Sequence, residues 1–258
     1  MLFLIQENLF KEDHYTMLIE LMERYKFDYK IVNTNQLEDN GINIDINTTN
    51  VFCFGSIKMA HVATKNNWYP ASFMNDNHDY EVYSKEFGLE NMLNGDSIIC
   101  NFSDKINFDT DKFIRPCKDT KVFTGKVYNK YDWEDFVEDQ LHNNNRKHLK
   151  SDTKIQVSTP KLIQQEIRCW IVKGKVVTTS YYKLGSIMYM GECLDELVLN
   201  FAQEMVNKYQ PADSFVLDVC LVDNKPFIVE INCINCSGFY RQDLSKLINA
   251  LLVYDIEK

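Results

Sequence analysis

The sequence predicts an α/β protein that changes to α+β in its C-terminal part. Three observations lead to this prediction. Strand-like and helix-like segments alternate over the first hundred residues, short strands follow one another between residues 112 and 182, and two apolar strands joined by a turn occupy 215–232. Alternating strands and helices favour a mostly parallel sheet, whereas strands joined by short turns favour antiparallel hairpins.

Residues 1–105 are expected to form an N-terminal α/β unit. Apolar runs of strand length alternate there with segments whose apolar residues recur at helical spacing. Connections rich in Asn and Asp, at 33–50 and 74–79, are expected to be loops. The expected elements are strands at 1–5, 28–33, 51–54 and 97–101, and helices at 12–26, 57–66 and 80–93.

Residues 106–160 are expected to form a second, smaller unit. Asp132 is predicted to cap a helix over 133–141, because a side-chain oxygen at that position accepts a hydrogen bond from the first helical turn. The strands of this unit are predicted at 112–116, 121–128 and 154–157, with Gly125 interrupting the middle one.

Residues 161–258 are expected to form a third unit. The turn Lys173-Gly174 joins two strand patterns and is a hairpin signal. Strands are predicted at 162–172 and 175–182, and helices at 193–208 and 241–252, on either side of the strands at 215–232.

Composition limits the classes of function. The 258 residues suffice for a real hydrophobic core, and the formal charge of −9 argues against general binding to nucleic acid or to an anionic membrane. No apolar run reaches the length of a membrane span. The opening apolar run is too short for a signal peptide and is expected to be the first strand. These features predict a globular, cytoplasmic protein.

Eight scattered cysteines fit free thiols in a reducing cytoplasm. Cys233 and Cys236 have C-x-x-C spacing, which raises zinc binding or redox chemistry as alternatives. A structural zinc site normally has four ligands, and no second cysteine pair or histidine cluster completes such a set in the sequence.

Carboxylates stand in the middle of two apolar strands near the C-terminus, in "FVLDVCLVDNKPFIVEIN". A three-residue loop, which pairs Val222 with Pro226, would place Asp218 directly opposite Glu230 with Cβ atoms about 5 Å apart. Asn232 would share their face, because side chains alternate along a strand. Two carboxylates and an amide oxygen form a hard-oxygen site suited to Mg²⁺.

Two alternatives weaken this interpretation of the hairpin. Carboxylates on a strand often point into solvent, and an Asp-Asn turn is ordinary hairpin chemistry. A two-residue loop would shift the register by one residue and place the two carboxylates on opposite faces. The metal site therefore depends on the turn.

Basic residues upstream supply a partner for a phosphate that Mg²⁺ would bridge. Arg115 ends an apolar strand, Lys118 and Lys121 follow it, and the amides of Thr124-Gly125 are able to approach a phosphate closely. In the next strands, Glu166 and Arg168 share one face opposite Ile167, Cys169 and Ile171, and Lys183 ends the strand after them. The sequence contains neither G-x-x-x-x-G-K-[ST] nor G-x-G-x-x-G, so the common phosphate-binding loops are absent from it.

The order of these segments resembles the ATP-grasp superfamily over about residues 80–250. The segments that carry the resemblance are "FIRPCKDTKVFTG", "EIRCWIVKGKVVTTSYYK" and "FVLDVCLVDNKPFIVEIN". The first of these, with "EIR", is similar to a phage- and bacteria-associated clade. That clade is related to the eukaryotic cell-division-cycle ATP-grasp proteins, which help to assemble a translation initiation factor. The resemblance implies an N-terminal α/β unit and two lobes that enclose ATP.

The resemblance also implies roles for individual residues. Most relatives carry Lys at the position of Arg115 and a longer glycine-rich loop, but an Arg also binds phosphate. The implied roles are Mg²⁺ binding by Asp218, Glu230 and Asn232, contact with the ATP phosphates by Arg115 and Lys121, contact with the γ-phosphate and an acyl phosphate by Arg168 and Lys183, and adenine binding by a hinge at 155–158. Glu166 is grouped with the cofactor-binding residues. Two roles are considered for it, orientation of Arg168 or handling of the amine's proton, and a purely structural ion pair is the alternative.

The leading hypothesis is a Mg-ATP-dependent carboxylate–amine ligase that acts through an acyl phosphate on small-molecule or peptide substrates. An ATP-binding assembly factor without ligase turnover is the alternative, and it requires a surface for a protein partner. A third hypothesis is an interaction module whose hairpin carboxylates are solvated. The substrates are not predicted, although His14, Trp68 and Tyr69 are the polar aromatics considered for a pocket.

Overall fold

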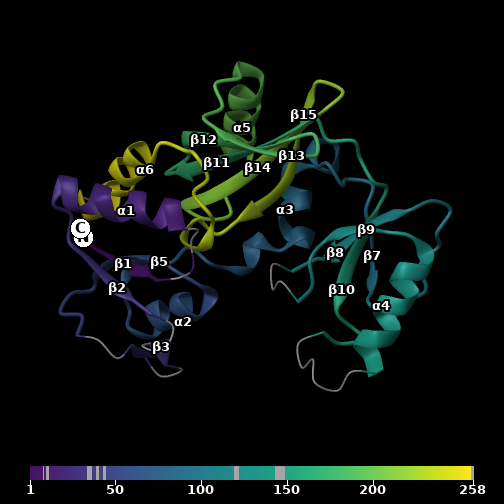
Figure 1. Cartoon of the computed structure of the whole chain (residues 1–258), viewed down its shortest axis with the longest axis horizontal. Coiled ribbons are helices and arrows are strands. Elements are labelled where there is room, and N and C mark those ends of the chain that lie inside the picture. Colours follow the sequence, from purple (N-terminus) through teal and green to yellow (C-terminus); the bar gives the residue numbers. More distant parts are fainter. Residues whose placement is uncertain are drawn as a thin grey trace.

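Three β-sheets, each with its own helices, form the architecture of the computed structural model (Figure 1). The structure describes residues 1–7, 9, 12–33, 37–38, 41–42, 45–118, 122–142 and 149–256. The mixed α/β class is confirmed. A separate two-stranded ladder, β3 (Leu37–Glu38) with β4 (Gly41–Ile42), lies in the segment that was expected to be only a loop.

The first sheet is parallel, as the alternation of strands and helices predicts. Its order is β2-β1-β5-β6, so β1 lies inside the sheet and β6, which contains Pro70, lies at an edge. Strand β6 was not predicted. The elements of this unit are β1 (Leu2–Gln6), α1 (Glu12–Tyr25), β2 (Tyr29–Val32), β5 (Asn50–Phe54), α2 (Ile57–Lys65) and β6 (Tyr69–Ala71).

The expected helix at 80–93 is interrupted at Gly88. Helix α3 covers Tyr80–Phe87, and a 3₁₀ turn, η3, covers Leu89–Asn91. An earlier 3₁₀ turn, η2 (Asp76–His78), precedes α3. Gly88 has φ +83°, a conformation that side-chain-bearing residues rarely adopt, and it ends the α-helix there.

The second sheet is antiparallel, with the order β7-β10-β8-β9. Helix α4 packs on it through Trp133, which contacts Phe102 and Tyr128 edge-on. The helix starts earlier than expected, because Asn129 rather than Asp132 occupies the cap and accepts the Asp132 amide at 2.9 Å. The elements are β7 (Ile98–Asn101), β8 (Lys112–Pro116), β9 (Lys126–Tyr128), α4 (Lys130–His142) and β10 (Lys154–Ser158). The strand expected over 121–128 is thus shortened, and Lys121 lies outside the described residues.

The third sheet is antiparallel, with the order β13-β12-β11-β14-β15. The edge strand β13 was not predicted. The strands are β11 (Gln165–Val172), β12 (Lys175–Leu184), β13 (Ile187–Gly191), β14 (Ser214–Val222) and β15 (Lys225–Asn232), and the helices are α5 (Glu196–Lys208), the 3₁₀ turn η4 (Ile234–Cys236), α6 (Leu244–Leu251) and α7 (Val253–Ile256).

The two faces of the third sheet have different surroundings. One face, with Ile167 and Cys169 of β11, packs in a core that includes residues of α5 and α3. On the opposite face, Trp170 packs in a core with residues of α6 and the first sheet. Glu166 and Arg168 share the face of Trp170, so the predicted division of the two faces is confirmed. The apolar end of that face anchors the sheet and leaves its other end for polar residues.

The hairpin of β14 and β15 has a two-residue turn, not the three-residue loop on which the metal-site prediction relied. Val222 pairs with Lys225, and both turn residues, Asp223 and Asn224, have positive φ. A β-bulge then adds one residue to β15 between two neighbouring pairs, Val219 with Ile228 and Asp218 with Glu230. That residue is Val229, and the bulge restores the register in which Asp218 lies directly opposite Glu230. The expected turn was wrong, but the expected pairing is present.

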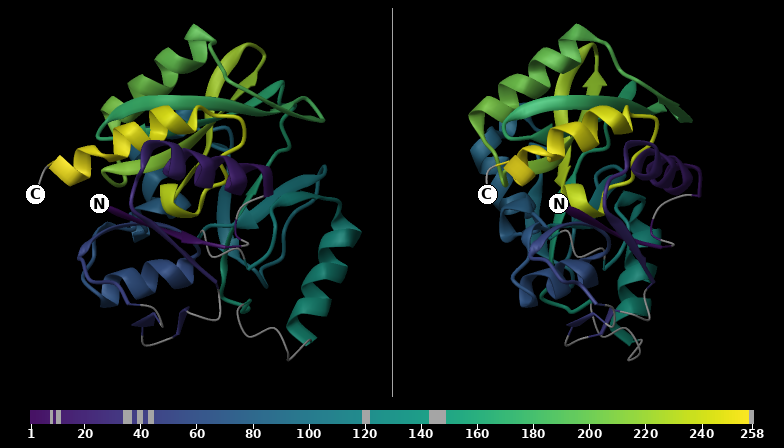
Figure 2. Two further views of the ribbon diagram at one scale, coloured as in Figure 1. Left: turned by 60° about the vertical axis from the view of Figure 1, so that its left-hand side comes forward. Right: turned by 90° about the vertical axis from the view of Figure 1, so that its left-hand side faces the viewer.

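Helices α1 and α6 lie side by side, and the two chain ends lie close together (Figures 1 and 2). The amino group of Met1 contacts Asp255 Oδ1 at 2.8 Å, which ties β1 to α7. In the part of the chain that the structure describes, no helix combines the length and the apolar character needed to cross a bilayer.

Asn235 in η4 connects the third sheet to the first. Its side-chain amide donates to the carbonyl oxygens of Cys53 (2.7 Å) and Ala71 (3.0 Å), and its oxygen accepts the Phe73 amide (2.8 Å). Asn235 is only 2% exposed, so water does not replace these bonds. The side chain holds the end of β15 against the carboxyl ends of β5 and β6.

Replacing Asn235 by Ala is expected to lower the free energy of unfolding by about 3 kcal/mol or more, because several buried backbone groups lose their partner at about 1 kcal/mol or more each. Urea unfolding followed by circular dichroism measures this loss. Asn47→Ala is the control: its exposed amide donates to the exposed Asp45 carboxylate at 3.0 Å, so a change within about 0.5 kcal/mol is expected. Equal stability of the two variants would contradict the role of Asn235.

Candidate functional site

A cavity of about 820 Å³ lies between the second and third sheets, a volume typical of sites for small molecules. We call the second sheet with α4 the small lobe, the third sheet with α5 the large lobe, and this space the interlobe cavity. Its walls come from β8 and β9, from the linker at 159–164, from β11, β12 and β15, and from the segment after η4.

The structure gathers the sequence-predicted site residues at this cavity. Six of them line it: Arg115, Glu166, Arg168, Lys183, Glu230 and Asn232. Asp218 is 1% exposed and lies behind the cavity wall, against Arg168 and Asn232. Lys118 also lines the cavity and pairs with Asp79 at 3.3 Å. The predicted Lys121 lies outside the described residues.

Two β-bulges direct side chains of the large lobe into the cavity. In β12 the register shifts at Tyr182, and in β15 it shifts at Val229. Consecutive residues of a regular strand point to opposite faces, yet Tyr182 and Lys183 both line the cavity, as do Val229 and Glu230. The bulges explain this, because an extra residue turns the strand locally.

Arg168 and Asp218 form a buried pair at the centre of the site. They lie directly opposite each other on β11 and β14, and the guanidinium donates from Nε to Oδ1 (2.9 Å) and from Nη2 to Oδ2 (2.8 Å). Complete burial raises the pKa of the Asp218 carboxyl, although Arg168 opposes this effect. Burial lowers the pKa of Arg168, but Asp218 outweighs it and the net shift is upward. The guanidinium therefore stays charged.

Two tyrosines that the sequence did not reveal hold the Arg168 guanidinium. The rings of Tyr182 and Tyr240 stack with centroids 5.1 Å apart, and Arg168 Cζ lies 4.9 Å from the Tyr240 centroid and 5.8 Å from that of Tyr182. Arg168 Nη1 also donates to the Gly238 carbonyl at 3.4 Å. These contacts fix the orientation of the cation. Tyr240 has φ +50° in a loop, so no strand or helix pattern signals it.

Glu166 orients Lys183 instead of Arg168. Its carboxylate pairs with Lys183 Nζ at 2.9 Å and accepts the Tyr182 hydroxyl at 3.0 Å. Burial, and then the Asp218 and Glu166 carboxylates, raise the pKa of Tyr182 well above its usual value, so the hydroxyl keeps its proton. Lys183 Nζ is held at the cavity wall as a fixed cation.

Arg115 brings a positive charge from the small lobe to the large lobe. Its Nη1 lies 2.5 Å from Glu230 Oε2. Burial acts to raise the pKa of Glu230, but Arg115 and the Asn232 amide outweigh it and hold the pKa below its usual range. Gly125 passes close to Arg115: a Cβ at this position would lie 2.7 Å from Arg115 Cβ, so glycine is needed for the close approach.

The residues present fit Mg²⁺ in donor type and in position. The Asn232 amide lies 3.0 Å from Glu230 Oε1 and 3.3 Å from Asp218 Oδ2, so the three side chains converge on one region. A half-turn of that amide presents its oxygen to the same region. Among the described residues, no three His, Cys, Asp or Glu side chains gather in a way that could hold a metal, so two carboxylates and one amide are the donor set here.

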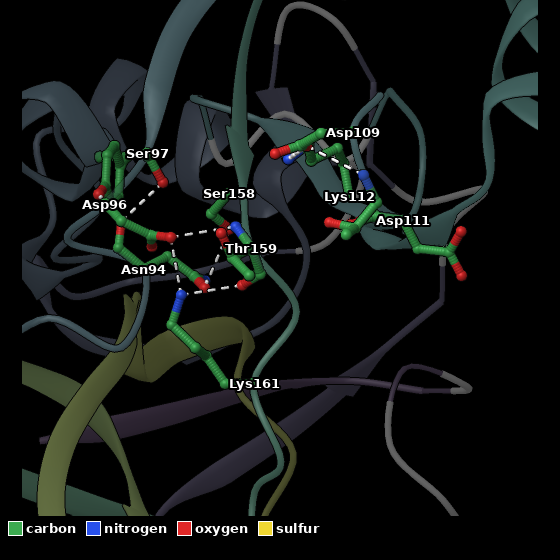
Figure 3. A network of polar contacts seen from close by, with 11 residues as sticks. Asn94, Asp96, Ser97, Asp109, Asp111, Lys112, Ser158, Thr159 and Lys161 are labelled. Carbon is green, nitrogen blue, oxygen red and sulfur yellow. Dashed lines mark hydrogen bonds and ion pairs between the residues drawn. The ribbon is translucent and has the colours of Figure 1, made fainter. Parts of the chain in front are cut away.

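The linker between the lobes is fastened to the segment before β7 (Figure 3). Asp96 Oδ2 accepts the Thr159 amide (3.1 Å) and Lys161 Nζ (2.8 Å), and Asn94 Oδ1 accepts the Ser158 hydroxyl (3.1 Å). Partial burial acts to raise the pKa of Asp96. The hydrogen bonds from Lys161 and Thr159 lower the pKa by more than burial raises it, so the net shift is downward. The linker is therefore held on one side by a carboxylate that is charged at neutral pH.

The expected adenine hinge at 155–158 does not line the interlobe cavity. Ile155 and Val157 are buried in the small-lobe core, and the cavity is lined instead by Pro160, Lys161 and Ile163. The three polar aromatics considered for a pocket also lie elsewhere. His14 and Trp68 are buried in the N-terminal unit, and the ring of Tyr69 packs edge-on against Tyr254, with centroids 6.3 Å apart.

Replacing Asp218 by Leu is expected to lower the free energy of unfolding by about 3–5 kcal/mol, because Arg168 keeps a buried charge without its partner. The double variant Arg168→Met with Asp218→Leu removes both charges and should regain most of that loss. Urea unfolding compares them. Asp213→Asn is the control, since the exposed Lys173–Asp213 pair should contribute less than about 1 kcal/mol. A double variant no more stable than Asp218→Leu would contradict this account.

Solved structures share this fold over nearly their whole length. D-alanine–D-alanine ligase from Bacillus anthracis, complexed with ATP, superposes with a TM-score of 0.65 at 14% identity, covering 100% of this chain and 97% of that one. A RimK domain ATP-grasp protein from Sphaerobacter thermophilus gives 0.62 at 12% identity, with coverage of 99% and 98%. The ATP-grasp ligase PsnB, complexed with its minimal precursor, gives 0.60 at 11% identity, with coverage of 98% of each chain.

Sequence comparison places the chain in a family. A search of curated protein sequences gives no significant match. A family profile described as an ATP-grasp domain, family 3 of its clade, matches residues 35–251, which is most of the chain and includes the whole of the interlobe cavity. The resemblance noted in the three sequence segments is thereby confirmed at the level of the superfamily. The chain belongs to this family of the ATP-grasp superfamily.

Proposed function

We propose that this protein is a Mg-ATP-dependent carboxylate–amine ligase that acts in the cytoplasm on small-molecule or peptide substrates. The observation that carries the proposal is the pairing of charges in the interlobe cavity. Arg115, Arg168 and Lys183 each contact one of the carboxylates Glu230, Asp218 and Glu166, at the boundary between two lobes. Family membership supports the use of ATP, and the named ligases with this fold support the reaction class.

The proposed nucleotide site runs across the cavity from the linker to β12. Pro160 and Ile163 of the linker, with Phe113 and Phe123 of the small lobe, offer apolar surface for adenine. The phosphates would lie toward Arg115 and Lys183. We propose three functional units, an N-terminal α/β unit over 1–105, a small ATP-grasp lobe over 106–160 and a large one over 161–258. Strand β7 lies within the first range, but it pairs with β10 in the sheet of the small lobe.

Asp218, Glu230 and Asn232 are the proposed Mg²⁺ ligands. When bound, Mg²⁺ neutralises phosphate charge and orients the γ-phosphate for transfer. In the chain alone the arginines already neutralise the carboxylates. Mg²⁺ at Glu230 would release Arg115 for a phosphate group, to two oxygens of which a guanidinium donates parallel hydrogen bonds.

The proposed reaction has two steps. In the first step, a substrate carboxylate oxygen attacks the γ-phosphorus, and the bond from that phosphorus to the β–γ bridging oxygen breaks. The products are ADP and an acyl phosphate. An amine nitrogen then attacks the acyl carbon, phosphate departs, and the amine loses a proton. Arg168 and Lys183 are proposed to stabilise the charge on the transferred group, which is the main contribution a fixed cation makes to such a step. Glu166 is proposed to keep Lys183 in place.

One observation favours a second candidate, an ATP-binding assembly factor without ligase turnover. Such a factor needs a surface for a protein partner, and the edge strand β13 has an exposed apolar surface. Ile187 is 70% exposed, Met188 59% and Tyr189 48%. The strand has no charged side chain to discourage pairing with another strand. This candidate shares the nucleotide site and differs only in turnover.

Glu230→Gln is expected to weaken Mg²⁺-dependent ATP binding by about 2–3 kcal/mol, roughly a hundredfold, because a ligand charge is lost. Isothermal titration calorimetry with and without Mg²⁺ measures this. Glu230 suits this binding test better than Asp218, because replacing Asp218 would also lower the free energy of unfolding. Asp213→Asn, outside the cavity, should bind ATP as the natural chain does. Unchanged Mg²⁺-dependent affinity in Glu230→Gln would overturn the metal site.

Lys183→Met is expected to lower ATP-dependent phosphate release with candidate amines and amino acids by about a hundredfold or more, as when one preorganised donor is removed. ATP affinity should change much less. Lys246→Met, an exposed pair partner of Glu192, is the matched control. If the natural chain binds ATP but releases no phosphate with any candidate pair, the assembly-factor candidate is favoured.

A further inference from the structure

Two thiols with C-x-x-C spacing border the interlobe cavity, and neither has a role in the proposed reaction. Cys233 follows Asn232 directly and is 2% exposed. Cys236 closes the 3₁₀ turn η4, is partly exposed, and lines the cavity. Cys236 therefore borders the space proposed for the nucleotide, and Cys233 is buried three residues before it.

The backbone between these cysteines has the geometry of a tight turn. The Cys236 amide donates to the Cys233 carbonyl at 3.3 Å, and a turn closed in this way keeps its first and last Cα atoms less than about 7 Å apart. A disulfide spans Cα separations of about 4.4–6.8 Å, so the pair can be bridged without unfolding η4.

Both thiols make hydrogen bonds within the turn. The Cys236 thiol donates to the Cys233 carbonyl at 3.6 Å, and the Cys233 thiol donates to Asn235 Oδ1 at 3.3 Å. Both thiols are therefore gathered around the one short turn, within which side chains can change rotamer without a change in the backbone.

The remaining six cysteines differ from this pair. All eight lie among the described residues, and each is a thiol rather than half of a disulfide. Cys53, Cys117, Cys169, Cys193 and Cys220 are buried, and Cys100 on β7 is partly exposed but does not line the cavity. Cys236 thus combines access to the cavity with a second thiol three residues away. Cys100 offers an internal reference of similar exposure in the same molecule.

We propose that Cys233 and Cys236 form a reversible dithiol–disulfide site in the wall of the interlobe cavity. The oxidant is a small hydroperoxide. The Cys236 thiolate attacks one peroxide oxygen and gives a sulfenic acid with loss of hydroxide or alkoxide. The Cys233 thiol then attacks that sulfur and loses its proton, the S–S bond forms, and the sulfenic oxygen leaves as water. Two thiols lose two protons and two electrons, and the peroxide is reduced to water, or to water and an alcohol.

The position of this site couples it to the contents of the cavity. The disulfide draws the Cys236 sulfur away from the cavity wall, and it stiffens a turn that lies between Asn232 and Gly238, both of which contact the charged residues of the site. A ligand that covers Cys236 blocks its oxidation, and by linkage the oxidised turn binds that ligand less tightly.

The first test uses the natural chain without nucleotide. The protein is treated with hydrogen peroxide, unfolded in urea and alkylated with iodoacetamide. The mass of the tryptic peptide 209–241, which contains Cys220, Cys233 and Cys236, is then measured by mass spectrometry. The expected peptide has lost two hydrogen atoms and carries one alkyl group, on Cys220, while reactive thiols fall from the eight of the reduced chain to six. Dithiothreitol should restore all eight. Cys233→Ser and Cys236→Ser should each leave no disulfide in this peptide.

Two results would overturn the dithiol site. One is Cys236 that stays reduced under conditions that oxidise Cys100. The other is Cys236 that passes to sulfinic or sulfonic acid without forming a disulfide, since an adjacent resolving thiol intercepts the sulfenic acid first. Both are measured on the natural chain, so neither depends on whether a variant folds.

The second test rests on the proposed nucleotide site. Alkylation of reduced Cys236 is timed with Mg-ATP at about ten times its calorimetric Kd, where only about a tenth of the sites stay empty. An approximately tenfold slower reaction at Cys236, with Cys100 unchanged, is expected. If ATP binds but the alkylation of Cys236 is not slowed, Cys236 does not lie beside the bound nucleotide. Absence of ATP binding would overturn the proposed function, and the first test would still decide the dithiol site.

Discussion

The buried pair of Arg168 and Asp218 is the constraint on which the candidate site depends. Both side chains are removed from water, so each needs the other, and their bidentate contact fixes β11 against β14 in one register. Strand β14 also pairs with β15, which places Glu230 opposite Asp218, and Glu166 lies two residues before Arg168 on the same face of β11. The apolar continuation of the same face, through Trp170, holds the sheet against α6 and the first sheet.

Charge is balanced locally across the cavity, and this suggests how an anion enters. Each of the three carboxylates Glu230, Asp218 and Glu166 contacts a cation, so the charges of these three pairs sum to about zero. Mg-ATP carries a net negative charge, and the three cations are its natural partners. Arg115 is the cation best placed to exchange, because it comes from the other lobe and its contact is partly exposed. Binding would then replace a contact between lobes by a contact with the ligand.

Alternation and turn signals in the sequence were sufficient to predict the fold class, most strands and the shared face of Glu166 and Arg168. They could not predict contacts that arise from bulges or from distant segments. Lys183 reaches the cavity only because of the bulge at Tyr182, and Arg115 meets Glu230 only when the lobes pack. The turn prediction failed for a similar reason. Ile228 must lie on the face of Val219 to be buried, which a three-residue loop would prevent.

The bulge at Val229 has a consequence for insertions and deletions in this family. A chain that lacks this one residue would keep the two-residue turn, keep Ile228 opposite Val219, and still place Glu230 opposite Asp218 in a regular ladder. A one-residue change between Glu230 and Asn232 has no such tolerance, because it moves Asn232 to the other face. When relatives of different hairpin length are aligned, the gap therefore belongs at Val229, between the turn and the acidic residue.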